Sequence, residues 1–548
     1  MLKRLAVLAI LLSSLLLNGC GTDNFADLVL TGGTIMTADG QPASAIALKD
    51  GRILSVGNDL ADLVGPETRV IELDGAVVSP GFNDSHAHLY GLGKSLGQID
   101  LMGTESAAEA VRMAQQAHAD LPDGTWLEGR GWDQNDWAVQ DYPTAAMLDA
   151  VTGDRPTFLR RVDGHAAWAN SAALRAAGIT ADTPDPEGGE ILRDSQGRPT
   201  GILIDNGNDL VRAAIPEVGL EEMERRVKLA VAHCWSEGVT GVHEAGVSWR
   251  RAELYKRLAA AGELDLRLYG MYDDVPATLD SAVAAGPYVS DDHLLTMRAI
   301  KLYGDGALGS RGALLLNDYS DQHGYHGLAV TTTEHLREVI RRGADSGFQL
   351  CTHAIGDGAN RLVLDLYEEL LPAENDLRWR VEHAQILHPD DIPRFGQLGV
   401  IAAMQPTHCT SDMDWANERL GDDRLLGAYA WRSLLASGAH ICFGTDFPVE
   451  RVNPLHGLFS ARTRTHHDGT PPAGWQPQEI LTGAEAHSLY TAGSAYAAFQ
   501  ESELGRLAPG YLADLVVLDG NPVTCEPQEL LSMQVLHTVV HGELVYSK

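Results

Sequence analysis

The chain has 548 residues, more than one ordinary hydrophobic core accommodates, so we expect two domains. Hydrophobic residues make up 44% and charged residues 21%, with 57 Gly and 24 Pro, a composition that excludes a fibrous or disordered chain. The 41 Lys and Arg against 75 Asp and Glu give a formal net charge of −34, which repels phosphate backbones and argues against nucleic acid as a partner.

The first twenty residues predict an export signal. Lys3 and Arg4 precede an apolar run from Leu5 to Leu17, which is the layout of a secretory signal and is too short to span a membrane comfortably. The following letters LNGC resemble a bacterial lipobox, in which Cys20 becomes the lipidated first residue of the mature chain. The alternatives to lipidation are cleavage of the signal without lipidation and an uncleaved signal that serves as a membrane anchor. Gly21 stands where an inner-membrane retention signal places Asp, so the resemblance implies an exported cell-envelope lipoprotein, in a Gram-negative cell at the periplasmic face of the outer membrane.

The two ends of the chain share one pattern. From about residue 24 to 78, short apolar runs alternate with turns, as in LVLTGGTIMTADG and AIALKDGRILSVG. The segment from 500 to 548 repeats this style in ADLVVLDGNP and VLHTVVHGELVYSK. Such alternation is typical of β-hairpins. We therefore expect both ends to form one small β-sandwich domain.

Between these ends, helix-like and strand-like segments alternate. LEEMERRVKLAVAHCWSEG precedes the apolar VTGVHE, and TEHLREVIRRGADSG precedes FQLCTHA. This order predicts βα units and a parallel sheet. The fold class is therefore expected to be α/β, with a TIM-like (β/α)8 barrel over about residues 79–499.

The strongest local signal is GFNDSHAHLYG, where one residue separates His86 from His88 at the end of an apolar strand. Residues two apart in a strand point to the same face, so both imidazoles can reach one metal ion. The pair alone is only moderately specific, because two histidines on one strand face often have structural roles.

Four further candidates lie on short strand-like segments. They are Lys301 in AIKLYGDGALGS, His353 in QLCTHAIGDG, His383 in WRVEHAQIL and Asp446 in ICFGTDFPVE. One βα unit averages roughly 30 residues, which is the spacing from His353 to His383 and half the spacing from His383 to Asp446. With Asp446 at strand 8, His383 ends strand 6, His353 ends strand 5 and Lys301 ends strand 4. The carboxyl ends of barrel strands carry the chemistry of such enzymes, so these side chains are expected to converge.

The interval from His88 to Lys301 exceeds three βα units by roughly a hundred residues, which predicts an insertion at about 100–230. The Trp and His content of GRGWDQNDW and RRVDGHAAWANSAAL suggests part of a substrate pocket. His165 is a candidate substrate or oxyanion contact, or else a loop histidine. Trp132 is a candidate substrate contact, with core filling as the alternative. Arg311 could bind a substrate carboxylate or form a salt bridge at a helix end.

Taken together, these motifs closely resemble the amidohydrolase superfamily. KLYGDGALGS, THAIGD, VEHAQ and GTDFPV are similar to its amidohydrolase-3 branch, which includes N-substituted formamide deformylase-like proteins, and the resemblance runs from about Asp27 to the C terminus. It implies Lys301 as a carboxylated, bridging lysine; alternatively, Lys301 pairs with Asp305 or Glu382 in a one-metal site. The ligands that the resemblance implies are His86, His88, His353, His383 and Asp446.

The expected cofactor is one or two divalent ions, zinc first, since imidazoles and carboxylates suit zinc, which activates a bound water near neutral pH. Asp446 is the expected catalytic residue, which takes the proton of the attacking water and returns it to the leaving nitrogen. The predicted reaction is hydrolysis of an amide-type C–N bond in a small N-acyl or N-formyl amine or a cyclic amide; esters, ureas and carbamates stay open. A non-catalytic envelope lipoprotein that binds a metal or ligand, or regulates, is the alternative, and a homo-oligomer is compatible with the sequence.

Overall fold

The computed structural model describes residues 25–122, 124–134, 137–161, 166–186, 189–309 and 311–548. The predicted export signal, Cys20 and His165 lie outside the described residues. The chain forms two compact units: the first holds the chain up to Ala87, Cys234–Asp446 and Glu450–Lys548, and the second holds His88–His233 and Phe447–Val449. Within the described ranges, no helix has the length and apolar character needed to cross a membrane.

The first unit contains eight parallel strands in a nearly closed barrel, which confirms the predicted α/β class and TIM-like fold. Each neighbour pairs in parallel, and the short antiparallel β16 (Tyr288–Val289) is added beside β17. In sheet order the barrel strands are β7 (Phe82–Ala87), β14 (Val239–Val247), β15 (Arg267–Asp273), β17 (Leu295–Tyr303), β18 (Gln349–Ala354), β19 (Arg380–His383), β20 (Ile401–Met404) and β21 (Ile441–Phe443).

The chain beyond β21 meets β7 through a few specific bonds. The Asp446 amide donates to the His86 carbonyl oxygen at 2.8 Å, and the Thr445 hydroxyl donates to the buried Asp84 carboxylate at 2.6 Å. A Cβ on Gly444 would lie 2.5 Å from the His86 nitrogen, a distance that real side chains do not reach. Glycine at this position therefore permits the close approach of the first and last strands.

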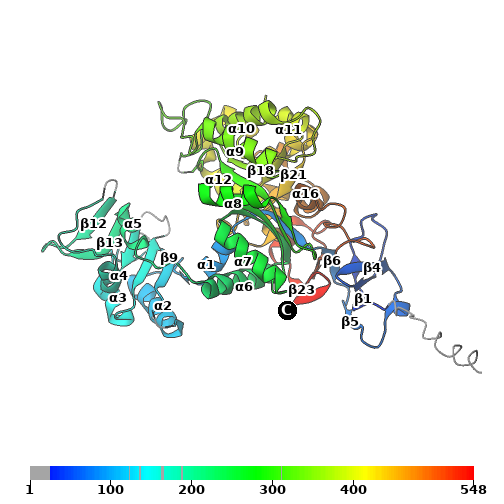
Figure 1. The fold of residues 1–548 in the computed structure, drawn as a ribbon, viewed down its shortest axis with the longest axis horizontal. Coiled ribbons are helices and arrows are strands. Elements are labelled where there is room, and N and C mark those ends of the chain that lie inside the picture. Colours follow the sequence, from blue (N-terminus) through cyan, green and yellow to red (C-terminus); the bar gives the residue numbers. More distant parts are fainter. Residues whose placement is uncertain (1–24, 123, 135–136, 162–165, 187–188, 310) are drawn as a thin grey trace, which may run out of the picture. The chain divides into compact units, whose positions relative to one another are not determined.

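Helices follow the barrel strands, as Figure 1 shows for α7 to α12. Helix α9 shows why these segments form helices. Thr332 caps its N-terminus by accepting a hydrogen bond from the His335 amide. The buried residues of α9 recur at helical spacing and are Leu336, Val339, Ile340 and Gly343. The helices are α7 (Trp249–Ala260), α8 (Pro276–Ala285), α9 (Thr333–Asp345), α10 (Asp357–Leu370), α11 (Ile392–Leu398), α12 (Pro406–Leu420), α13 (Trp431–Ala436), α14 (Pro454–Thr463), α15 (Gly483–Tyr490) and α16 (Ala492–Ala497), with 3-10 turns η3 (Asp422–Gly427) and η4 (Pro477–Glu479).

Both chain ends build the small β-sandwich of the first unit, as predicted. One sheet has the order β4-β3-β1-β5, and the other, β2-β6-β22-β23-β24, pairs β6 antiparallel with β22. Leu30 and Ile46 of the first sheet share one core with Val78 and Leu515 of the second. The elements are β1 (Leu28–Thr31), β2 (Thr34–Ile35), β3 (Ala45–Lys49), β4 (Arg52–Gly57), η1 (Ala61–Leu63), β5 (Arg69–Glu72), β6 (Val77–Pro80), β22 (Leu515–Leu518), η5 (Pro527–Leu531), β23 (Val535–Val540) and β24 (Glu543–Ser547).

The second unit is an insertion between β7 and β14, built on a six-stranded sheet in the order β12-β13-β11-β10-β9-β8. Its adjacent residues Phe158 and Leu159 belong to different apolar clusters, because successive strand residues face opposite sides. Both faces are therefore covered. The elements are α1 (Leu89–Leu96), β8 (Ile99–Asp100), α2 (Ala107–Asp120), β9 (Leu127–Trp132), α3 (Ala145–Thr152), β10 (Thr157–Arg161), β11 (Ala166–Ala169), α4 (Ser171–Ala176), β12 (Gly189–Arg193), β13 (Pro199–Asp205), α5 (Gly207–Arg212) and α6 (Leu220–Ser236), which leads to β14.

Candidate metal centre

The predicted site residues of the first unit lie at the carboxyl ends of the barrel strands. Lys301 lies in β17, His353 in β18 and His383 at the end of β19, while Asp446 follows β21. These are the fourth, fifth, sixth and eighth strands, which is the assignment that the sequence spacing predicts. Lys301, His383 and Asp446 are buried, at 1%, 5% and 7% exposure. The barrel thus brings ionisable groups from distant segments to one end.

Two groups of side chains have the geometry to hold an ion. The ligand atoms of His86, His88 and Asp446 all lie within 4.8 Å of one another, and His86 Nε2 is 3.7 Å from Asp446 Oδ1. His88 is the residue directly after β7. The second group, with the same spacing limit, is His383, His408 and Asp446. Asp446 belongs to both groups, so its two carboxylate oxygens can face two neighbouring positions.

His408 is the residue that the sequence analysis missed. It lies in the first turn of α12, shortly after β20, and its Nε2 is 3.2 Å from Asp446 Oδ2. Its other ring nitrogen is 3.2 Å from Glu450 Oε1. The sequence predicts the ligands at the ends of strand-like segments, whereas His408 lies on a helix. The available signal was its place in QPTHCT, directly after the seventh barrel strand, where barrel enzymes keep functional groups.

Hydrogen bonds fix the orientation of two imidazoles. His86 Nδ1 bonds to the Glu382 carboxylate, and His383 Nδ1 lies 2.8 Å from Gln405 Oε1. A carboxylate and an amide oxygen can only accept, so both Nδ1 atoms donate and the Nε2 atoms keep their lone pairs. His353 Nε2 is buried without a hydrogen-bond partner. Buried nitrogens with available lone pairs are what a divalent cation requires.

Burial also keeps these histidines neutral. It lowers the pKa of His353 to about 3, with further lowering from Lys301. It lowers the pKa of His383 well below the ordinary value, and it lowers that of His86 although Glu382 opposes the shift. Because only a neutral imidazole coordinates a metal, these three side chains fit the role of ligands at neutral pH.

His408 has the opposite electrostatics. Burial lowers its pKa, but the hydrogen bonds that the ring donates to Asp446 and Glu450 outweigh burial and raise the pKa to about 10. An imidazolium between two carboxylates donates from both nitrogens and has no lone pair for a metal. In this arrangement His408 holds the Asp446 carboxylate.

Lys301 is enclosed beside this cluster. Its Nζ lies 4.5 Å from the centre of the Tyr303 ring, and burial lowers its pKa to about 8 although Glu382 and Asp446 oppose the shift. The sequence offers Asp305 as an alternative partner of Lys301. In the structure the Asp305 carboxylate accepts hydrogen bonds from the backbone amides of Leu314, Ile355 and Gly356 at 2.8–2.9 Å. Asp305 thereby fixes the segments that follow β17 and β18.

The backbone is strained at two of the candidate ligands. His383 and Asp446 have φ of +74° and +61°, a left-handed conformation that residues other than Gly rarely adopt. Such strain is retained at functional sites when the surrounding structure enforces it. Here the Asp446 amide is held by the His86 carbonyl, and the His383 ring by Gln405.

The other predicted substrate residues have structural partners. Trp132 is completely buried in the second unit, in one cluster with Trp168, and its Nε1 donates to the Leu159 carbonyl at 2.8 Å. The Arg311 guanidinium binds Asp321 through bonds of 3.1 and 2.7 Å, in the segment between β17 and α9. Trp132 thus occupies a core position and Arg311 forms a salt bridge; their contacts with substrate stay predictions.

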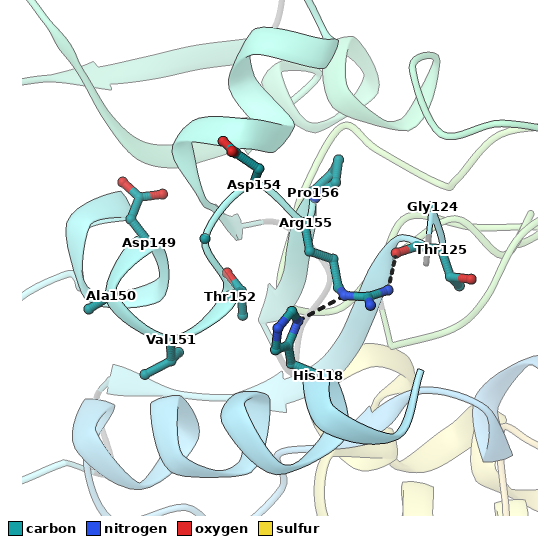
Figure 2. A pocket seen from close by; sticks show the side chains of 11 residues that line it. His118, Gly124, Thr125, Asp149, Ala150, Val151, Thr152, Asp154, Arg155 and Pro156 are labelled. Carbon is teal, nitrogen blue, oxygen red and sulfur yellow. Dashed lines mark hydrogen bonds between the residues drawn. The ribbon is translucent and has the colours of Figure 1, made fainter. Parts of the chain in front are cut away.

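A surface pocket of about 570 Å³ lies in the second unit (Figure 2). Figure 2 shows the Arg155 guanidinium directed at His118 and Thr125, and it also bonds to the carbonyl oxygens of Leu121 and Pro122. Its donors therefore bind the protein itself. None of the described residues that line this pocket belongs to the predicted ligand set.

Comparison with known proteins agrees with this geometry. Residues 69–546 match the model of the amidohydrolase family. The chain is 37% identical to the "Putative amidohydrolase YtcJ" of Bacillus subtilis, over 94% of this chain and 98% of the relative, and 30% identical to the N-substituted formamide deformylase of Arthrobacter pascens, over 95% and 98%. A crystal structure of an uncharacterized metal-dependent hydrolase from Pyrococcus furiosus superposes with a TM-score of 0.77 at 29% identity, over 91% of this chain and 100% of that one. The chain therefore belongs to the amidohydrolase family, in its amidohydrolase-3 branch, and is a metal-dependent hydrolase with a candidate His and Asp metal site.

Proposed function

We propose that the protein hydrolyses the amide-type C–N bond of a small N-acyl or N-formyl amine, or of a cyclic amide. The observation that carries this proposal is the gathering of neutral, oriented imidazoles around the Asp446 carboxylate at one end of the barrel. The reaction needs a polarised carbonyl, an activated water and a group that moves a proton. The site offers residues for each requirement.

One or two divalent ions, zinc first, are the proposed cofactor. An ion of this kind, when bound, polarises the scissile carbonyl and lowers the pKa of water. The buried, unpartnered Nε2 of His353 and the fixed tautomers of His86 and His383 fit such an ion. The residues that would hold it are His86, His88, His353, His383 and Asp446, with Lys301 as a further ligand.

Asp446 is the proposed proton carrier. Its carboxylate would take the proton of the attacking water and deliver it to the leaving nitrogen, which must be protonated to depart as an amine. His408 Nε2 lies 3.2 Å from one oxygen of Asp446. The other ring nitrogen of His408, Nδ1, lies 3.2 Å from Glu450 Oε1. This chain of contacts fixes the Asp446 carboxylate.

Lys301 is proposed to be carboxylated. A buried ammonium beside a bound cation is electrostatically unfavourable, whereas a carbamate is an anionic ligand. In the modification, the neutral Lys301 amine forms an N–C bond with CO2 and releases one proton. Carbon-13 NMR of protein prepared with labelled CO2 would show a carbamate signal that Lys301→Met lacks, and a wild-type spectrum without that signal would refute the modification.

The substrate class is supported by the Arthrobacter relative, whose name is N-substituted formamide deformylase. Wild-type protein with added zinc should be assayed on N-formyl amines, N-acyl amines and cyclic amides. Esters, ureas and carbamates should be tested as additional substrates. The products to quantify are the released amine and acid. Amide turnover supports the proposal, and binding of these amides without release of amine supports the non-catalytic alternative.

A matched pair of variants tests the chemistry. Asp446→Asn keeps the size of the side chain but cannot carry the proton, so we expect kcat to fall by about 10²–10⁴-fold. Asp365→Asn, at an exposed carboxylate of α10, should leave kcat unchanged. Circular dichroism verifies that both variants fold. An Asp446→Asn protein with wild-type turnover would refute the assigned role.

The proposed place of the reaction is the periplasmic face of the outer membrane, through lipidation of Cys20. Labelling cells with a radioactive fatty acid should mark the wild-type protein but not Cys20→Ser. A fatty-acid label on both proteins, or on neither, would contradict the lipidation of Cys20.

A further inference from the structure

We propose that Arg380 is a positioning residue that sets the affinity of the centre for its metal, acting through Glu382 and His86. This inference rests on the proposed function. It concerns a fully buried side chain in β19, which has no place in the ligand set itself.

Arg380 contacts three barrel strands below the candidate ligands. Its Nε lies 2.7 Å from Glu382 Oε1 and its Nη2 lies 3.1 Å from Glu382 Oε2. The Nη2 also donates to the Ser85 carbonyl at 2.5 Å in β7, and Nη1 is 3.0 Å from His243 Nδ1 in β14. Arg380 and Glu382 are two residues apart on one strand, so their side chains share one face.

Glu382 links this guanidinium to the metal centre. It is completely buried, and the carboxylate oxygen that accepts from Arg380 Nη2 also bonds to His86 Nδ1. Burial of a carboxylate without a partner is costly, and the guanidinium of Arg380 beside it compensates for this cost. Arg380 thereby holds the Glu382 carboxylate where it accepts from the Nδ1–H of His86. That bond directs the His86 Nε2 toward Asp446.

Loss of Arg380 would leave Glu382 without the guanidinium that contacts its carboxylate. The carboxylate would then be fixed less firmly in place, and a shift of its position weakens the bond to His86 Nδ1. The His86 ring would then be held less firmly, and its nitrogen would be a weaker electron donor. Partners of this kind, which orient a ligand without touching the metal, typically change metal affinity by about 10–100-fold.

A merely structural role must be separated from this one, because Arg380 also joins three strands. The chain offers a matched control in Arg267 of β15, which is 3% exposed and forms a bidentate pair with buried Asp514. Arg267 also contacts the backbone, at the His293 carbonyl at 3.1 Å. Arg267 is therefore also a buried arginine paired with a buried carboxylate, but its partner Asp514 accepts from the His541 amide, whereas Glu382 bonds to the candidate ligand His86.

The experiment measures Zn²⁺ affinity of the full chain by competition with a chromophoric chelator, after removal of bound metal. Variants are Arg380→Met, Arg380→Lys, Glu382→Gln and Arg267→Met. We expect Arg380→Met and Glu382→Gln to bind zinc about 10–100-fold more weakly, and Arg380→Lys to recover part of the loss by restoring the charge. Arg267→Met should lose thermal stability but keep wild-type affinity. With Co²⁺ as probe, the visible spectrum should change in Arg380→Met and not in Arg267→Met.

Wild-type affinity in Arg380→Met would overturn the inference while leaving the proposed metal centre intact. Equal losses in Arg267→Met and Arg380→Met would also overturn it, since the effect would then be general destabilisation. If Arg380→Met does not fold, Glu382→Gln decides, because it keeps the shape of the side chain and removes the charge. Wild-type protein that binds no zinc would instead defeat the proposed function itself.

Discussion

The amide of Asp446 donates to the carbonyl oxygen of His86 at 2.8 Å, so the proposed proton carrier and a candidate ligand are joined through the main chain. The same bond connects the chain after the last barrel strand to the first strand. Closure of the barrel and assembly of the candidate metal centre therefore depend on the same few residues. A change in the contact between the chain after β21 and strand β7 is expected to affect both the barrel and the metal centre.

Gly444→Ala tests this dependence. The new Cβ would lie 2.5 Å from the His86 nitrogen and 2.6 Å from Asp84 Oδ1, so β7 must move. We expect a loss of about 1–3 kcal/mol of stability, together with weaker zinc binding. Gly57→Ala, where the nearest atom is 3.5 Å away, is the control and should change neither. Differential scanning calorimetry and metal analysis provide the measurements, and normal zinc binding by a destabilised Gly444→Ala would argue against the link.

Removal of metal should affect activity and stability together. At neutral pH a strong chelator is expected to abolish amide turnover, and added zinc should restore it. A ligand present at 100 times its Kd stabilises the folded state by about 2.7 kcal/mol, so the metal-free protein should also melt at a lower temperature. Full activity after dialysis, with metal shown to be absent by mass spectrometry, would contradict the assigned chemistry.

His408→Gln should impair turnover more than substrate binding. Glutamine can still bond to one neighbour, but it cannot bridge Asp446 and Glu450 as the imidazole does. A hydrogen bond to a charged group contributes about 1.5–3 kcal/mol, which corresponds to about 10–100-fold in kcat. Steady-state kinetics should show this loss with little change in KM. His466→Gln, at a more exposed histidine paired with Asp414, is the control, and equal effects in both variants would show that His408 has no special role.

The acid sensitivity of the fold should depend on His487. Burial lowers its pKa from 6.5 to about 4, and its Nε2 lies 2.7 Å from the Ser79 hydroxyl. The unfolded chain therefore takes up a proton as the pH falls below 6.5, whereas the folded chain does so only near 4, so folding free energy is lost across this window. The loss from this group amounts to about 3 kcal/mol. Urea unfolding at pH 7 and pH 4.5 should show a smaller drop for His487→Gln than for wild type, and parallel drops would contradict the assignment.

Much of the fold could be predicted from local patterns. The alternation of helix-like and strand-like segments predicts the parallel barrel, and the hairpin pattern at both ends predicts the shared sandwich. The spacing among Lys301, His353, His383 and Asp446 assigns each to its strand, because a βα unit has a narrow range of lengths. These features depend on periodicity and length, which a sequence states directly.

The partners of the candidate ligands were decided by tertiary structure. His408 lies on a helix; its place after the seventh strand indicates a functional end of the barrel but not the contact with Asp446. The sequence offers Glu382 only as a partner of Lys301, yet it bonds to His86, 296 residues away. The sequence by itself determined which residues end which strands. How the ring nitrogens and carboxylate oxygens face one another depends on the stagger of strands around the nearly closed barrel, and such contacts between distant segments leave no periodic signal in the chain.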